Sequence, residues 1–484
     1  MSASTFSLPD IIQGGMGVAI SDWSLARAVS RTGAGNLGVV SGTGLATVLA
    51  RRLQTGDSEG HFREALKAFP IPEIAEKVLK QYFIPGGKEA EAPFRLNPVP
   101  NLANKAFIDL TVVANFVEVH LAKRGHNGEI GINLLEKIQI PTLASLFGAM
   151  LAGVDYVLMG AGIPRSIPGA LDRLAAGEEA ELKLDVQGAR DDDRFVSKLN
   201  PGDYDIGPES MKRPAFIGIV SSTVLAKTLA LRASGKVDGL IVEGPPAGGH
   251  NAPPRGALQL SESGEPVFNE RDLPDLKRIH DLGLPFWLAG AYGRPGMLEE
   301  AKARGATGIQ VGTAFAFCEE SGMLPEIKKK AIRQSREGTT RVFTDPYASP
   351  TGFPIKAFQA EGTLSEKSVY EQRKRICDLG YLRTLYRKED GSIGYRCPAE
   401  PVDDYVRKGG RPEATEGRAC ICNGLFGDIG LSQIRDDGEE PAFITVGDDV
   451  ARIAEFLPPG KDSYHASDVV AHLRSGSTEK SHSS

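Results

Sequence analysis

The sequence has little of what marks secreted or membrane-spanning proteins. Only 5 of its 484 residues are cysteines, all at or after Cys318, which argues against a disulfide framework and for a reducing compartment. No apolar run approaches the roughly 20 residues that a membrane-spanning helix needs. The first residues, MSASTFSLPDIIQGGMG, lack the basic start and apolar core of a secretory signal. We therefore expect a cytoplasmic protein with no membrane partner.

An excess of positive charge is also missing. The formal net charge is -6 at pH 7, so we expect no nucleic-acid partner and a small molecule as the substrate. Walker A, HExxH, GxSxG and GxGxxG motifs do not occur in a supporting context. These absences exclude several common enzyme classes and leave the oligomeric state open.

Short apolar runs alternate with amphipathic helical patterns up to about residue 315. Such alternation predicts a parallel sheet with helices on its outer face. The run ELKLDV (181–186) is the most charged, and we interpret it as an excursion from the sheet. The other runs lie at 11–15, 37–42, 130–135, 154–160, 215–221, 237–244, 286–290 and 307–312.

Eight strands fit an α/β fold of the (β/α)₈ TIM-barrel type, and a doubly wound open sheet is the alternative. Glycines or polar residues follow many of the runs, and a barrel gathers all these strand ends on one face, where active sites are built. We predict a barrel over 1–330 with a helical insertion at about 55–108. An additional C-terminal lobe over 331–484 should pack on the barrel, because no long Gly/Ser linker precedes it. Its tail, 477–484, is expected to be disordered.

Two glycine-containing loops follow the last two predicted strands. Gly290 and Ala291 lie in AGAYG, and Gly312 and Thr313 begin GTAF. Glycine lets backbone N–H groups turn toward an anion, and the loops after strands 7 and 8 are the usual phosphate site of this barrel. Each loop alone is equally typical of a tight turn. Their order at the last two strands predicts a phosphate site.

The segment EGPPAGGHNAPPRG (243–256) follows another predicted strand and contains His250. Gly248 and Gly249 let the chain bend and bring the imidazole close to a flat ligand, and prolines on both sides stiffen the loop. Histidine titrates near neutrality, so it can act as a base or an acid. The alternative is a histidine bonded to a neighbouring carbonyl. Its position at a strand end favours catalysis.

The loop GGMG follows the first predicted strand, so Gly15, Met16 and Gly17 can place their backbone against a planar ring. Asn133, within IGINLL, can offer its side-chain amide to a ring or substrate oxygen. A buried structural amide is the alternative for Asn133.

Together these segments resemble the nitronate monooxygenase, or 2-nitropropane dioxygenase-like, family. Its members share an FMN-binding TIM barrel with a class of flavin enoyl-acyl-carrier-protein reductases. The resemblance covers roughly 8–323 and is carried by QGGMG, GINLL, VLMGAGIP, IVSST, EGPPAGGH, AGAYG and VGTAFAFCEESG. The insertion and the C-terminal residues are similar to those of long-form members.

The resemblance implies FMN as the cofactor and His250 as the catalytic base. The flavin would be lined or approached by Gly15, Met16, Gly17, Gly248 and Gly249, bonded near its ring by Asn133, and held at its phosphate by Gly290, Ala291, Gly312 and Thr313. The chain departs from the family in two places. Ala291 stands where members usually have a second glycine, and Pro245 and Pro246 stand where they often have a glutamate.

The implied function is an FMN-dependent oxidoreductase of the nitronate monooxygenase type, which oxidises nitronates or nitroalkanes with oxygen. The flavin would supply the redox chemistry and His250 would move a proton beside the nitro group. The first alternative is an NAD(P)H-dependent flavin enoyl-thioester reductase that uses the same site. The second, of another class, is a flavin-binding electron-transfer or partner module.

Four cysteines lie in the expected lobe: Cys377, Cys397, Cys420 and Cys422. Four thiols could bind zinc or an iron–sulfur cluster. One CxC with two distant cysteines lacks the paired CxxC spacing of a zinc ribbon, and free cysteines are often simply buried. We therefore expect reduced cysteines and no metal, and we interpret Cys318 as a packing residue.

Overall fold

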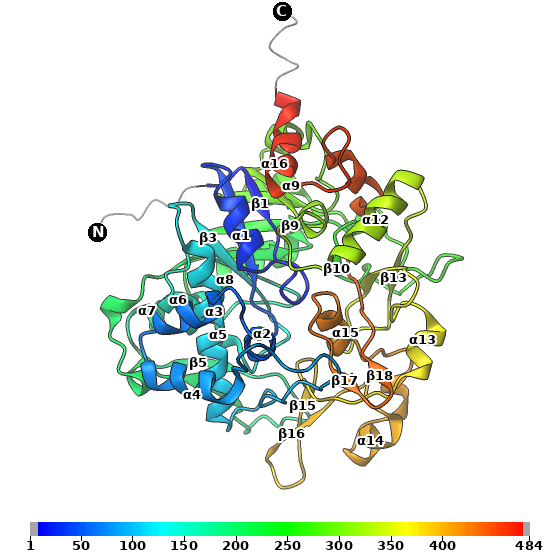
Figure 1. Ribbon diagram of the computed structural model, residues 1–484. Helices are drawn as coiled ribbons and strands as arrows, with labels where there is room; N and C mark the ends of the chain where they lie inside the picture. Colours follow the sequence, from blue (N-terminus) through cyan, green and yellow to red (C-terminus); the bar gives the residue numbers. More distant parts are fainter. Residues whose placement is uncertain (1–7, 478–484) are drawn as a thin grey trace, which may run out of the picture.

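The computed structural model describes residues 8–477 (Figure 1). Apart from its first residue, the segment 477–484 that was expected to be disordered lies outside the described residues. Among the described helices, none combines the length and the apolar character needed to cross a membrane.

A closed barrel of parallel strands forms the centre of the molecule, in the order β1-β12-β11-β9-β8-β4-β3-β2. Ile11 of β1 pairs with Asn36 of β2 on one side and with Ile309 of β12 on the other, which closes the sheet. The closure confirms the predicted barrel and excludes the open sheet. The strands are β1 Ile11–Gln13, β2 Asn36–Ser41, β3 Ile130–Leu135, β4 Tyr156–Gly160, β8 Ala215–Val220, β9 Gly239–Glu243, β11 Phe286–Ala289 and β12 Gly308–Val311.

Apolar side chains fill the barrel interior. Successive residues of a strand point to opposite faces, so Val39 joins the interior cluster while Val40 joins the layer between strands and helices. The indole Nε1 of Trp287 donates to the carbonyl of Pro9 at 2.6 Å, so the segment before β1 is tied to this interior. The interior cluster contains Ile12, Leu37, Val39, Tyr156, Leu158, Ala215, Ile217, Ile241, Trp287 and Ala289.

Helices surround the strands. The Asp22 side chain accepts from the N–H groups of Ser24 and Leu25 and so caps the first helix, and Asn104 caps α5 through Phe107. The outer helices after the first seven strands are α1 Trp23–Ser30, α2 Leu45–Gln54, α5 Lys105–Lys123, α6 Thr142–Leu151, α7 Ile167–Ala175, α8 Thr223–Arg232, α9 Leu276–His280 and α10 Met297–Ala303, of which both α2 and α5 follow β2.

Two excursions leave this regular repeat. The segment predicted as an insertion at 55–108 holds α3 (His61–Lys67) and α4 (Pro72–Tyr82), which pack against α5. The charged run 181–186 is confirmed as an excursion, because β5 (Ala180–Lys183) pairs with β7 (Val196–Leu199) outside the barrel. The short β6 (Val186–Gln187) pairs with a strand of the C-terminal lobe.

The C-terminal lobe is built from short strands and helices with a small core of its own, which includes Ile355, Ile421 and Phe443. Its link to the barrel is β10 (Gly249–His250), which pairs with β14. After α11 (Thr313–Ala316) and α12 (Pro325–Glu337), its elements are β13 Val342–Asp345, β14 Ile355–Phe358, α13 Lys367–Gln372, β15 Thr384–Arg387, β16 Ile393–Arg396, α14 Val402–Arg407, α15 Cys422–Gly427, β17 Ile434–Arg435 and β18 Gly438–Glu439.

The last helix returns to the barrel. Helix α16 (Ala466–Arg474) packs against both α1 and α10, and Figure 1 shows α16 beside α1. The Arg474 guanidinium donates to Asn36 at 2.9 Å and to Asp10 at 3.3 Å. Helix α16 thus occupies the place of the eighth outer helix. The lobe lies between β12 and α16, within the last strand–helix unit of the barrel.

Candidate active site

A pocket of ≈ 1360 Å³, including its open mouth, lies at the carboxyl ends of the barrel strands. The structure brings every site residue expected from the sequence to the wall of this pocket. They come from the loops after β1, β9, β11 and β12 and from β3 itself. They are Gly15, Met16, Gly17, Asn133, Gly248, Gly249, His250, Gly290, Ala291, Gly312 and Thr313.

The loop after β1 is held in place by two buried polar side chains, those of Gln13 and Ser21. Gln13 donates through Nε2 to Ser21 Oγ at 2.9 Å, and its Oε1 accepts from the Val39 N–H at 2.9 Å. Ser21 Oγ in turn accepts from the Met16 N–H at 3.0 Å. A buried network whose members are all paired is rigid, so the loop presents its backbone in one conformation.

Gly15 has a packing requirement of its own. A Cβ at Gly15 would lie 2.4 Å from Cβ of Asn133, which is far inside van der Waals contact. The Asn133 amide is fixed by donation from Nδ2 to the Leu158 carbonyl at 3.1 Å, which leaves its Oδ1 as an acceptor at the pocket wall. Asn133 therefore donates one structural hydrogen bond through Nδ2 and keeps Oδ1 as an acceptor. The structural role and the ligand-binding role considered for this residue are compatible.

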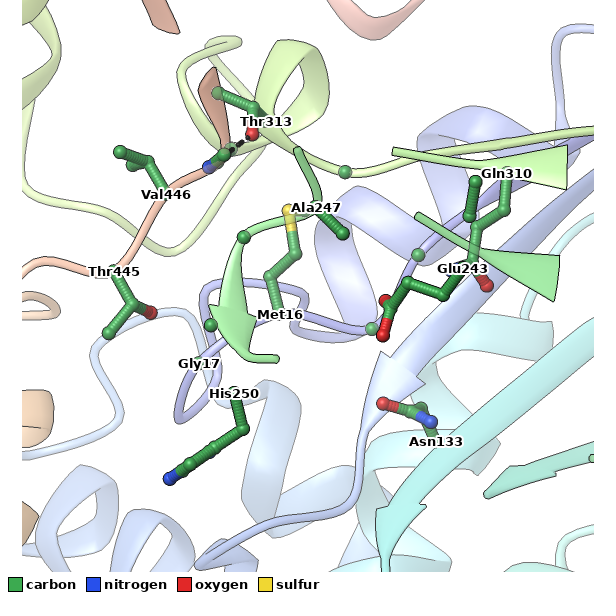
Figure 2. A pocket seen from close by; sticks show the side chains of 18 of the residues that line it. Met16, Gly17, Asn133, Glu243, Ala247, His250, Gln310, Thr313, Thr445 and Val446 are labelled. Atoms are coloured by element: carbon green, nitrogen blue, oxygen red, sulfur yellow. Dashed lines mark hydrogen bonds between the residues drawn. The ribbon is translucent and has the colours of Figure 1, made fainter. Parts of the chain in front are cut away.

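Two further polar groups at this end of the pocket were not expected from the sequence. Glu243 ends β9 and Gln310 lies on β12, and Figure 2 shows both near Asn133. Burial raises the pKa of Glu243 to about 7. Gln310 Oε1 is buried without a hydrogen-bond partner among the described residues. The signal that could have found them is their place at strand ends, where side chains reach the mouth of a barrel.

His250 sits where the barrel meets the lobe. The antiparallel pair β10–β14 places it opposite Ile355, and its Nε2 lies 2.6 Å from Ser349 Oγ. Ser349 Oγ also bonds to Thr351 Oγ1 at 2.8 Å. Burial lowers the pKa of His250 to about 4, so the imidazole is neutral at pH 7. Its partner is a serine hydroxyl, in place of the neighbouring carbonyl considered as the structural alternative.

The two loops expected to bind phosphate meet the lobe as well. Gly290 has φ +95° and Ala291 has φ +63°, a left-handed conformation that glycine adopts freely and alanine rarely. Thr313 Oγ1 accepts from the Gly447 N–H at 2.9 Å, and Figure 2 draws this bond beside Val446. The hydroxyl of Thr313 is thus already engaged by the C-terminal lobe.

A carboxylate reaches the same end of the pocket. Asp449 Oδ2 accepts from the Gly293 N–H at 3.2 Å and lines the pocket, and burial raises its pKa. Gly248 explains how the lobe comes so close, since a Cβ there would lie 2.5 Å from the Gly447 nitrogen. Sequence reasoning missed Gly447 and Asp449 as site residues, because they are distant in the chain from the barrel loops they contact.

Comparison with known proteins finds a family that part of the chain resembles. The family model described as nitronate monooxygenase matches residues 207–362. This segment contains Glu243, His250, both glycine loops and Ser349. Over this segment the chain is similar to the nitronate monooxygenase family.

Curated relatives match part of the length of this chain. A probable nitronate monooxygenase of Staphylococcus saprophyticus subsp. saprophyticus is 30% identical over 154 residues, which is 32% of this chain and 40% of that protein. A probable nitronate monooxygenase of Staphylococcus haemolyticus is 27% identical over 196 residues, 39% of this chain and 50% of that protein. The chain thus spans half or less of the curated relatives it matches.

Solved structures similar to this chain include FabK from Thermotoga maritima, with a TM-score of 0.47 and 14% identity. The comparison covers 96% of this chain and 91% of that one. Nitroalkane oxidase from Streptomyces ansochromogenes has a TM-score of 0.43 and 14% identity, covering 96% and 94% of the two chains. Likeness at this level does not bear on the activity of this chain.

Proposed function

We propose that this protein is an FMN-dependent oxidoreductase of the nitronate monooxygenase type, which oxidises nitronates or nitroalkanes with oxygen. One observation supports the proposal above the others. A neutral, serine-bonded His250 stands at the mouth of a barrel pocket that is lined by glycine loops. The family match over 207–362 covers this histidine and its serine partner.

The residues of the pocket fit FMN. The unpartnered Gln310 Oε1 and the exposed acceptor of Asn133 suit a ring that carries an N–H donor. At the other end, Gly290–Ala291 and Gly312–Thr313 would hold a single phosphate, and the chain has no dinucleotide fingerprint to hold a pyrophosphate. When bound, FMN supplies the acceptor for the substrate's electrons.

His250 would act as the base toward a nitroalkane. With Nε2 donating to Ser349, Nδ1 is the nitrogen with a free lone pair, and it takes the proton from the carbon beside the nitro group. Ser349 in turn donates a hydrogen bond through its hydroxyl to Thr351, so the chain of hydrogen bonds would stabilise the imidazolium that forms. A nitronate has already lost that proton, and there His250 would orient the anion.

A second candidate, the NAD(P)H-dependent enoyl-thioester reductase, is favoured by a neighbouring cavity of ≈ 1090 Å³. This cavity shares Glu243 and His250 with the main pocket and is also lined by Arg255 and Phe353. It could hold the long arm of a thioester, with Arg255 at hand for an anionic group. In that reaction His250 would deliver or orient a proton.

Anaerobic reduction of the purified yellow protein distinguishes the candidates. We expect nitronates to bleach the flavin absorbance and NADH and NADPH to leave it oxidised. Fast bleaching by NADPH or NADH together with enoyl-thioester turnover would favour the reductase. Flavin that neither class of compound reduces would favour an electron-transfer or partner module. Stoichiometric FAD, or no flavin after reconstitution, would contradict the proposal itself.

A further inference from the structure

The four cysteines of the lobe come together around one cavity of ≈ 410 Å³. Cys377 follows α13, Cys397 follows β16, and Cys420 and Cys422 lie at the start of α15. These three segments are separate in sequence, and the fold of the lobe alone makes them neighbours. All four cysteines are free thiols, so no disulfide accounts for their grouping.

The surroundings of the thiols are mostly apolar. Ile376, Leu379, Leu382, Ala399 and Ile421 line the same cavity. Cys397 is buried, Cys420 and Cys422 are half-buried, and Cys377 is exposed. Four thiols around one cavity suit a ligand that several cysteines bind together.

The four cysteines line one cavity, and this bears on the kind of ligand they could share. Within residues 8–477, no group of three or more His, Cys, Asp or Glu side chains is placed to hold one metal ion. The cysteines nevertheless share the wall of one cavity, as ligands of a group larger than an ion would. Four cysteine thiolates are the ligand set of a [4Fe–4S] cluster, whereas zinc would draw them to a single tetrahedral point.

Charge in the wall suits such a cluster. Four thiolates around an oxidised [4Fe–4S] core carry a net negative charge, and Arg375 and Arg383 line the cavity. The third charged lining residue, Glu400, is paired with Lys408 at 2.5 Å and accepts from the Cys397 N–H at 3.2 Å. The Glu400 carboxylate is therefore neutralised by the ammonium group of Lys408.

We propose that Cys377, Cys397, Cys420 and Cys422 bind a [4Fe–4S] cluster in the C-terminal lobe. The site adjoins the catalytic pocket without being part of it. Pro350, the residue after Ser349, lines the cysteine cavity, and Arg418 donates to the Ser349 carbonyl at 2.7 Å. Leu425 of α15 lines the barrel pocket. The cluster would therefore fix the segments that hold the partner of His250.

The test uses the full-length protein, expressed with added iron and purified without oxygen, or reconstituted with ferrous iron and sulfide. We expect about four iron and four acid-labile sulfide per chain, together with the visible absorption and the EPR signal after reduction of such a cluster. Cys397→Ala and Cys422→Ala should lose most of this iron and sulfide. Cys318→Ala removes a cysteine buried in the barrel core and should keep both.

The iron and sulfide content of the unaltered protein decides the matter even where a variant folds poorly. A folded wild-type protein that binds neither iron nor sulfide after reconstitution would overturn the proposal. So would one zinc per chain without sulfide, or iron that persists unchanged in Cys397→Ala and Cys422→Ala. Circular dichroism of each variant separates loss of ligands from loss of fold.

Discussion

His250 owes its chemical form to its surroundings. Burial lowers the pKa of its imidazole to about 4, and the bond of Nε2 to Ser349 Oγ fixes the ring at 2.6 Å from a hydroxyl that itself bonds to Thr351. A histidine on the surface would be partly protonated near neutrality, whereas buried His250 is neutral there. Glu243 shows the opposite shift, since burial raises its pKa to about 7.

The role of His250 can be measured directly. We expect His250→Ala to keep its flavin and to lose about 10²–10⁴-fold in kcat/KM on a nitroalkane, the usual contribution of a general base. Ser349→Ala should lose less, because the imidazole stays and only its orientation is relaxed. Flavin content serves as the control in both. Near wild-type kcat/KM in His250→Ala would return the histidine to a structural role.

The two shifted pKa values predict a pH dependence. Loss of the basic form of His250 should depress kcat/KM only as the pH falls toward about 4, well below the ordinary value for histidine. A second transition near pH 7 should belong to Glu243 and should vanish in Glu243→Gln. A single fall in kcat/KM on the acid side near pH 6.5, seen in both the wild type and Glu243→Gln, would contradict these assignments.

Glu243 also links pH to stability. Because its pKa in the folded protein is raised, the folded state binds the proton more tightly, and this contribution to stability is lost as the pH rises through about 7. We expect Glu243→Gln to raise the free energy of unfolding by about 1–3 kcal/mol at pH 8 and to change it little at pH 4. Thermal melts at the two pH values give the difference, and an equal effect at both would refute the linkage.

At the scale of the elements, the glycine loops are shaped by conformation and by close approach. Gly248 allows the backbone of the lobe near Gly447 to come within contact, and Ala291 adopts φ +63°, a conformation that glycine adopts freely. The left-handed conformation costs an alanine about 1 kcal/mol and costs a β-branched residue more. The loop therefore tolerates a small side chain at residue 291, at a cost in conformational free energy.

This argument predicts opposite outcomes for two substitutions at one position. Ala291→Gly should keep flavin content and thermal stability at or above wild type, because the strain is relieved. Ala291→Val should lower the flavin content several-fold, because a β-branched residue at this φ costs of the order of 1–3 kcal/mol. Flavin absorbance per chain measures both. Equal flavin content in the two variants would show that the backbone here does not depend on the side chain.

The whole molecule is organised by the return of its last helix to the barrel. Helix α12 leaves the barrel, the lobe covers the pocket through β14 and the segment at Gly447, and α16 then packs between α1 and α10. Arg474 ties this helix to Asp10 and Asn36 at the start of the barrel. The lobe is therefore held to the barrel at both of its ends.

Truncation tests this organisation. Ending the chain near residue 330 cuts α12 and removes both the lobe and the eighth outer helix, so we expect an insoluble or flavin-poor barrel. Ending it after residue 465 removes only α16 and should lower the Tm while leaving the lobe in place. Soluble, flavin-loaded and fully active protein from the shorter chain would show that barrel chemistry needs neither part.

The sequence by itself determined the barrel strands and the loops that carry the pocket. Runs such as IGINLL and AFIGIVS are short, apolar and followed by breaks, and their pairing with adjacent strands follows from that local pattern. The glycine loops after β11 and β12 were visible for the same reason, since glycine beside a strand end is a local signal. The family match over 207–362 agrees with this reading.

Only the tertiary structure decided what meets those loops. Ser349 reaches His250 across 99 positions, and Gly447 reaches Thr313 across 134. The four lobe cysteines and the docking of α16 are contacts of the same kind. No periodicity or spacing in the sequence encodes these contacts. They arise when separate segments bury their apolar faces together, and the polar groups at the resulting interface then hydrogen-bond to whichever partners lie close enough.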